Sequence, residues 1–254
     1  MIPAKPEKPE KPEASAKPVE SVKPVRPVKP PKSKALLRST VLLAVAAGIA
    51  ASPVQAGAAV HREPAEGVQY VKLDHPQPVR EAARTEAVEF FWYDCGHSQQ
   101  LEQPLQAWSD KHRSDVALRR VPAIWQGGPD EAAQRGHARL YYTLERLGLV
   151  ERLQVSAFRS VHNDKADLTT EVAATDWAAR HGVDPRQFRD AYRSADVARS
   201  VDDAAAQFVR YGVNELPTVV VQGEYRTSPS KAGGVDAMPE VLDHLVQQEQ
   251  RRKH

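Results

Sequence analysis

The chain has 254 residues, of which 41% are hydrophobic, and its 35 Lys and Arg side chains nearly balance 33 Asp and Glu side chains, for a net charge of +2. The sequence shows no basic patch with interleaved aromatic residues, which argues against nucleic acid as a partner. Because Cys95 is the only cysteine, no disulfide can form within the chain.

The first 56 residues have the composition of a polar tail followed by an export signal. Residues 1–34 hold nine of the twenty prolines in Lys-Pro repeats, which is typical of polyproline II or disorder. Residues 35–56 combine basic residues, an apolar run and a small-residue end at Val54 and Ala56, the pattern of a signal peptide. The apolar run is shorter than the ~20 residues of a membrane span, so we expect cleavage, with membrane contact only through this segment if it stays uncleaved.

Residues 57–254 are mildly acidic and suffice for one domain. A nearly continuous apolar run predicts a strand over 87–93, buried on both faces. A helix is expected over 95–112, kinked or interrupted at Pro104, followed by a strand over 116–122. This strand-helix-strand order predicts a right-handed crossover between parallel strands.

The span 130–211 reads as a run of helices, because leucines and other apolar residues recur there at helical spacing. Asp184 before Pro185 predicts a helix N-cap. Strand character returns at 218–222 and continues after a turn at Gly223 as a hairpin. A final amphipathic helix carries Val241, Leu242, Leu245 and Val246.

Cys95 stands where the first strand meets its helix and is followed by Gly96, His97 and Ser98. A thiolate is the attacking species in disulfide exchange. The helix N-terminus, His97 and the Ser98 hydroxyl would stabilise that thiolate, whereas the carboxylate of Asp94 would oppose it. The alternatives are a buried, inert thiol and a solvated His97. Cys95 and His97 are too few ligands to predict a metal site.

Glu89 lies inside the apolar strand, where a carboxylate is costly unless it is paired or neutral. It is either a functional acid or a structural partner of Arg119 or Arg120 on the next strand, and the sequence leaves both open. Trp92 is interpreted as a core residue or a wall of a binding groove.

Three motifs together carry a resemblance: Glu89-Phe90-Phe91, then Cys95-Gly96-His97-Ser98, and downstream Gly212-Val213-Asn214-Glu215-Leu216-Pro217-Thr218. They resemble the DsbA family of periplasmic thiol-disulfide oxidoreductases, over nearly all of residues 66–250. The resemblance implies an α/β thioredoxin-like fold with a helical domain inserted at about 128–211, and a periplasmic location.

The resemblance also implies roles for the residues of the first two motifs. In the family, the first cysteine of Cys-Pro-His-Cys is the nucleophile, which matches Cys95, and its histidine, which matches His97, stabilises the thiolate. A buried glutamate that assists proton transfer matches Glu89. The second cysteine falls on Ser98 and is missing, and Gly96 replaces the proline.

The third motif matches the substrate groove of the family. Its proline, Pro217 here, is a cis-proline facing the active site, and Leu216 lies beside it in the peptide groove. We add Gly96 and Trp92 to the expected substrate-binding residues.

The sequence therefore predicts an exported oxidoreductase that acts through one cysteine. An attack by Cys95 ends in a mixed disulfide that only an outside thiol can release. The expected partners are cysteine-containing exported proteins and small thiols. No cofactor or metal is expected, apart from glutathione in the role of a co-substrate. The alternative is a redox-inactive member of the family that binds peptides as a chaperone or adaptor.

Overall fold

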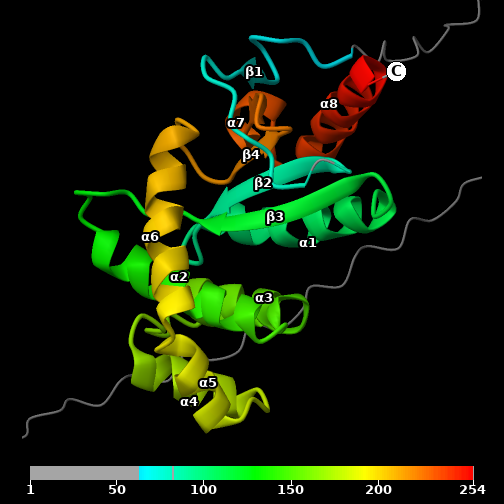
Figure 1. Ribbon diagram of the computed structural model, residues 1–254. Helices are drawn as coiled ribbons and strands as arrows, with labels where there is room; N and C mark the ends of the chain where they lie inside the picture. The colour runs from blue at the N-terminus through cyan, green and yellow to red at the C-terminus, as the bar shows by residue number, and fades with distance from the viewer. Residues whose placement is uncertain (1–62, 82, 254) are drawn as a thin grey trace, which may run out of the picture. The chain divides into compact units, whose positions relative to one another are not determined.

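The computed structural model describes residues 63–81 and 83–253. The predicted Lys/Pro-rich segment 1–34 and signal peptide 35–56 lie outside the described residues. Five strands form one sheet in the order β1-β5-β4-β2-β3 (Figure 1). They are β1 (Val71–Lys72), β2 (Thr85–Phe91), β3 (Val116–Pro122), β4 (Thr218–Val221) and β5 (Tyr225–Thr227).

The helices fall into a block within the chain and a group around the sheet (Figure 1). The block comprises α2 (Glu131–Arg146), α3 (Val150–Phe158), the π-helix η1 (Arg159–Asn163), α4 (Glu171–Arg180), α5 (Pro185–Tyr192) and α6 (Ala195–Arg210). The others are α1 (Gly96–Lys111), α7 (Pro229–Ala232), the 3-10 helix η2 (Val235–Ala237) and α8 (Met238–Lys253). The block occupies the span in which the sequence predicts a helical insertion. The expected interruption at Pro104 is wrong, because α1 continues through it.

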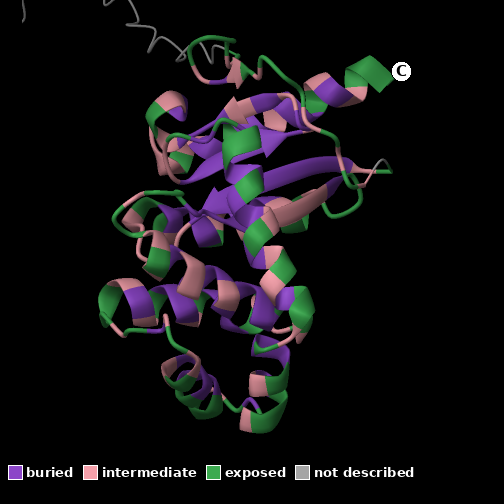
Figure 2. Ribbon diagram, turned by 60° about the vertical axis from the view of Figure 1, so that its left-hand side comes forward, coloured by how far each residue is buried: buried purple, intermediate pink, exposed green. Residues whose placement is uncertain are grey.

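Strand β2 is the centre of the site's scaffold. All seven of its residues are buried (Figure 2), as its nearly continuous apolar run predicts. It pairs in parallel with β3 and antiparallel with β4. The register places Glu89 opposite Arg120 on one side and Val219 on the other. The observed strand ends at Phe91, two residues earlier than expected.

The alternation of β2 side chains separates two hydrophobic cores. Val88 and Phe90 pack into a core shared with the helical block. Ala87 faces the other way, into a core formed with Leu101 and Leu105 of α1 and with α8. This two-sided burial fixes β2 and α1 relative to each other, and with them the junction at which Cys95 lies.

Local sequence signals account for the ends of several elements. The Asp184 carboxylate accepts hydrogen bonds from the backbone N–H groups of Arg186 and Gln187 at 3.0 and 2.8 Å, which confirms the predicted N-cap of α5. The predicted hairpin is also present. Its three-residue loop has positive φ at Gln222 (52°) and Gly223 (64°), the two central residues of a turn that the Glu224 N–H closes onto the Val221 carbonyl at 3.0 Å. Over residues 63–81 and 83–253, no helix has both the length and the apolar character of a membrane span.

Candidate active site

Cys95 is the N-cap residue of α1, with extended backbone angles (φ −96°, ψ 116°). A turn from Trp92 to Asp94 leads from β2 into the helix and is closed by the Cys95 N–H, which donates to the Trp92 carbonyl at 3.0 Å. The thiol is partly exposed. The first N–H groups of a helix have no intrahelical acceptor, so the positive end of the α1 dipole lies at the cysteine.

The thiol faces the loop before β4. Cys95 Sγ donates to the Leu216 carbonyl at 3.7 Å, and the Leu216–Pro217 peptide bond is cis, as the family resemblance implies. The loop is held by the Thr218 hydroxyl, which donates to the Glu215 carbonyl at 2.7 Å. The structure thus brings together two of the three sequence motifs, which are 121 residues apart.

Ser98 differs from the expectation that its hydroxyl would donate to Cys95. It is fully buried, and its Oγ instead accepts a hydrogen bond from the Trp92 backbone N–H at 3.4 Å. Ser98 therefore ties the first turn of α1 to the end of β2.

His97 is exposed and lines a cavity of about 660 Å³ together with Leu216. The other lining residues are Gln100, Glu215, Pro229, Ser230, Gly234, Val235 and Asp236. Among the described residues, no hydrogen bond joins His97 to Cys95, so its role in stabilising the thiolate stays a prediction. The cavity leaves an open groove beside the Leu216 carbonyl that faces the thiol.

Glu89 is completely buried and its partner is Arg120. Arg120 Nε lies 3.1 Å from Glu89 Oε2, but the N–H points off line, so neither Glu89 oxygen accepts a hydrogen bond. Burial raises the pKa of Glu89 to about 8, against the opposing effect of the Arg120 charge. The other candidate, Arg119, pairs instead with Glu86 at 2.9 Å.

The Glu89 pair belongs to a larger buried polar network that the sequence does not predict. The guanidinium of Arg120 also donates to Glu102 of α1 at 2.9 Å, and burial raises the pKa of Glu102 too. Gln154 of α3 lies beside Glu102 and accepts a hydrogen bond from the Tyr93 hydroxyl at 2.7 Å. The sequence contains one signal for this network: the acidic Glu102 directly follows Leu101, an apolar residue that is buried in the structure. The network joins β2, β3, α3 and α1, the helix that begins at the reactive cysteine.

Trp92 is half-buried, and its indole Nε1 donates to Nδ1 of His137 in α2 at 2.9 Å. Burial lowers the pKa of His137 to about 4. Trp92 is therefore anchored to the helical block. It is not among the residues lining the cavity beside His97.

Asp94, on the other side of Cys95, has two partners that the sequence does not predict. Its Oδ1 lies 3.4 Å from His162 Nδ1 and 3.2 Å from Lys165 Nζ. Both partners follow α3, about seventy residues further along the chain. The ammonium group of Lys165 thereby offsets part of the negative charge that would oppose a Cys95 thiolate.

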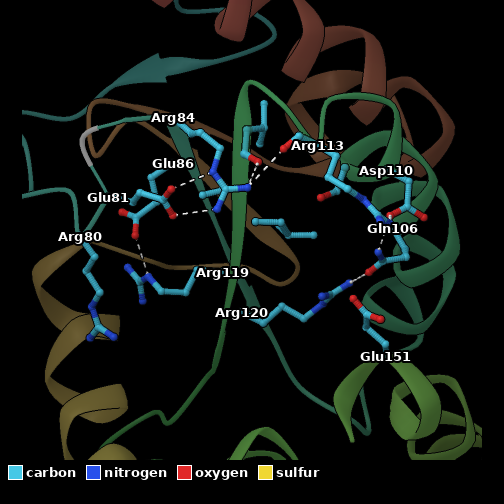
Figure 3. Close-up of a pocket in the computed structure, with 14 residues that line it drawn as sticks. Arg80, Glu81, Arg84, Glu86, Gln106, Asp110, Arg113, Arg119, Arg120 and Glu151 are labelled. Carbon is cyan, nitrogen blue, oxygen red and sulfur yellow. Dashed lines mark hydrogen bonds and ion pairs between the residues drawn. The ribbon is translucent and has the colours of Figure 1, made fainter. Parts of the chain in front are cut away.

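A separate cavity of about 590 Å³ runs along β3, away from Cys95 (Figure 3). Several of its charged side chains pair with one another, as in the two hydrogen bonds from Arg84 to the Glu81 carboxylate. None of the predicted site residues lines it. In the described part of the chain, no three His, Cys, Asp or Glu side chains are grouped to hold a metal ion.

Comparisons with known proteins agree with this geometry. The family model of the DSBA-like thioredoxin domain matches residues 120–246. The chain is 36% identical over 218 residues to the thiol:disulfide interchange protein DsbA of Burkholderia cepacia, covering 85% of this chain and 98% of that protein. The corresponding protein of Azotobacter vinelandii is 35% identical over 183 residues, covering 72% and 83%.

Solved structures give the same answer. The crystal structure of Pseudomonas aeruginosa DsbA superposes with a TM-score of 0.69 at 31% identity, over 74% of this chain and 96% of that one. The Xylella fastidiosa oxidoreductase DsbA superposes with a TM-score of 0.66 at 25% identity, over 75% of this chain and all of that one. With the thiol at the head of α1, the cis-proline loop facing it and an inserted helical block, this chain belongs to the DsbA family of thiol:disulfide oxidoreductases.

Proposed function

We propose that this protein is an exported, periplasmic thiol-disulfide oxidoreductase that works through Cys95 alone, forming mixed disulfides with client proteins or glutathione. The observation that carries the proposal is the position of the thiol. It is partly exposed at the positive end of α1 and within hydrogen-bond reach of the Leu216 carbonyl. A helix N-terminus favours the thiolate, which is the form that attacks disulfides.

The chemistry needs an outside thiol in its second half. The Cys95 thiolate attacks the glutathione sulfur of a glutathionylated client, so that a Cys95–glutathione disulfide forms and the client thiolate leaves and takes up a proton. A second glutathione thiolate then attacks the glutathione sulfur on Cys95, giving oxidised glutathione and regenerating the Cys95 thiolate. For isomerisation, the Cys95 thiolate attacks a disulfide within the client, so that a Cys95–client disulfide forms and one client cysteine leaves as a thiolate. Another client cysteine then attacks the client sulfur of that bond, which forms a new client disulfide and releases the Cys95 thiolate.

The groove beside the thiol supports a polypeptide substrate. Leu216 and His97 line an open cavity of about 660 Å³ next to the cysteine. That volume exceeds the needs of a single side chain and suits a short extended segment. A client held there would present its sulfur to Cys95 from the groove side of α1.

The same groove supports a second candidate function, a redox-inactive chaperone or adaptor that binds unfolded peptides. The two functions differ in their need for the thiol. Binding through the groove does not require Cys95, whereas exchange does.

The test is removal of glutathione from a glutathionylated peptide by the purified full-length protein, with Cys95→Ser as the matched control. We expect turnover that depends on Cys95 and a protein–glutathione intermediate visible by mass spectrometry. Equal rates in the parent and in Cys95→Ser would reject the oxidoreductase proposal. Peptide binding retained in both would then favour the chaperone.

A further inference from the structure

We propose that His162 is the charge partner of the Cys95 thiolate, a positioning residue that Gly96 makes room for. This inference deepens the proposed function and rests on it, since the thiolate that His162 serves is the one that the mixed-disulfide cycle uses. The imidazole comes from η1, in the helical block, and contacts the residues on both sides of the cysteine.

The two ring nitrogens of His162 face the two neighbours of Cys95. Nδ1 lies 3.2 Å from the Asp94 carbonyl oxygen and 3.4 Å from Asp94 Oδ1. Both are acceptors, so Nδ1 carries a proton and donates it. Nε2, on the opposite side of the ring, lies 3.1 Å from the position that a Cβ atom would take at Gly96. Nε2 is therefore the ring nitrogen nearest the first residue of α1.

The helical block holds the imidazole in this position. His162 lies in η1, and π-helical turns are frequent at functional sites. The next residue, Asn163, accepts a hydrogen bond from the Gln99 side chain of α1 at 2.6 Å. This bond fixes η1 against the first turn of α1.

Two charged side chains lie near the ring, on the side of Asp94. Asp94 faces it directly, and Lys165 shares the Asp94 carboxylate but is largely in solvent, with its side chain 67% exposed. The His162 side chain is 31% exposed, so its charge is less screened than that of Lys165. An imidazolium here offsets Asp94 and adds to the positive end of α1.

The contribution falls in the step where Cys95 is the leaving group. When an outside thiolate attacks the client or glutathione sulfur, a new S–S bond forms and the electron pair of the broken bond stays on Cys95. A nearby imidazolium stabilises that charge and speeds release. Ser98 is buried, and the one side-chain hydrogen bond that the described residues show for it is accepted from the Trp92 backbone.

The absence of a side chain at Gly96 leaves room for the His162 ring. A Cβ atom at this position would lie 3.1 Å from His162 Nε2 and 3.3 Å from Cε1, closer than ordinary van der Waals contact. A Cβ atom at position 96 therefore requires the ring to shift by a few tenths of an ångström. This gives a physical reason for glycine where the resembling family has proline.

The test is the rate at which iodoacetamide alkylates Cys95 in the full-length protein at pH 7, a reaction that reports thiolate without any disulfide substrate. We expect His162→Gln to slow alkylation about fivefold, the effect of about 1 kcal/mol from one partly screened charge. His162→Lys should restore the rate, because it returns the positive charge. The matched control His75→Gln changes an exposed histidine elsewhere and should leave the rate unchanged.

A double-mutant cycle ties the effect to Gly96. Gly96→Ala should slow alkylation in the parent and have no further effect in the His162→Gln background. A His162→Gln rate equal to that of the parent, or a His162→Lys rate as low as that of His162→Gln with the fold intact by circular dichroism, overturns the inference. If the His162 variants change the alkylation rate as expected but the protein does not turn over the glutathionylated peptide, only the proposed function is rejected.

Discussion

The indole N–H of Trp92, the residue after β2, donates to Nδ1 of the buried His137 of α2 at 2.9 Å, so His137 is a neutral acceptor. Protonation at Nδ1 would place two donors against each other. Together with burial, this explains why the pKa of His137 falls from 6.5 to about 4.

The protein should therefore lose stability in mild acid. A histidine with a lowered folded-state pKa takes up its proton first in the unfolded chain, so its contribution is present above pH 6.5 and is lost as the pH falls towards 4. We expect the free energy of unfolding to drop by about 2 kcal/mol across this range, measured by urea titration. His137→Gln, which keeps an acceptor for Trp92, should flatten the slope, and His75→Gln should not. Parallel curves for the parent and His137→Gln would contradict this account.

Glu89 should act in the opposite direction. Its pKa is raised from 4.5 to about 8 by burial, so the fold favours the protonated acid. The stability that this gives is complete below pH 4.5 and is lost as the pH rises through 8. We expect Glu89→Gln to be more stable than the parent by about 2 kcal/mol at pH 9 and close to it at pH 5. Urea titrations at both values check this, with the exposed Glu66→Gln as control. An equal offset at both pH values would show that Glu89 is ionised throughout.

Ser98→Cys should give the protein an internal disulfide and a dithiol oxidase activity. Positions 95 and 98 are three residues apart at the start of α1, and intramolecular attack by a second thiol outpaces an outside one on the order of tenfold or more. The measurement is oxidation of a reduced two-cysteine peptide. Ser98→Ala is the control and should show no gain. A folded Ser98→Cys protein that forms the disulfide but oxidises no peptide would show that the groove has changed as well.

Gly136→Ala should destabilise the protein by about 3 kcal/mol, although alanine favours helices. A Cβ at this position of α2 would lie 2.5 Å from the Thr169 carbonyl oxygen and 2.7 Å from its Cα, so the backbone before α4 would have to move. Thermal unfolding measures the effect. The exposed Ala132→Gly in the same helix should cost only about 1 kcal/mol. A Gly136→Ala protein with a raised melting temperature would mean that helix propensity outweighs this close contact.

The sequence predicts the scaffold of the site better than its surroundings. The strands that contain Glu89 and Val121 can be predicted from apolar runs, and the start of α5 can be predicted from Asp184. Each of these signals lies within a few neighbouring residues. The meeting of Cys95 with Pro217 came only from the family resemblance. Spacing alone does not bring together segments 121 residues apart.

The residues that the sequence does not predict are those whose partners come from the inserted helices. His162 lies on the block, 68 residues from Asp94, and nothing local marks it as part of the site. In the sequence Glu102 looks like any polar helix residue. Only the structure shows that Gln154 of α3 lies beside it. The Ser98 hydroxyl illustrates the same limit. Its position in the motif suggests a bond to the thiol, but the end of β2 offers it a backbone N–H instead.

Strand β3 is the last strand of the described sheet on its side, and such a strand normally offers main-chain groups to any extended polypeptide nearby. Here Arg84 donates to the Val116 carbonyl at 3.3 Å and covers part of that edge, while arginines and carboxylates line the cavity beside it (Figure 3). The flank is therefore a poor template for strand addition. An unfolded chain that meets the molecule here finds solvated charge, and the sheet resists being drawn into aggregates of the very polypeptides that carry reactive cysteines.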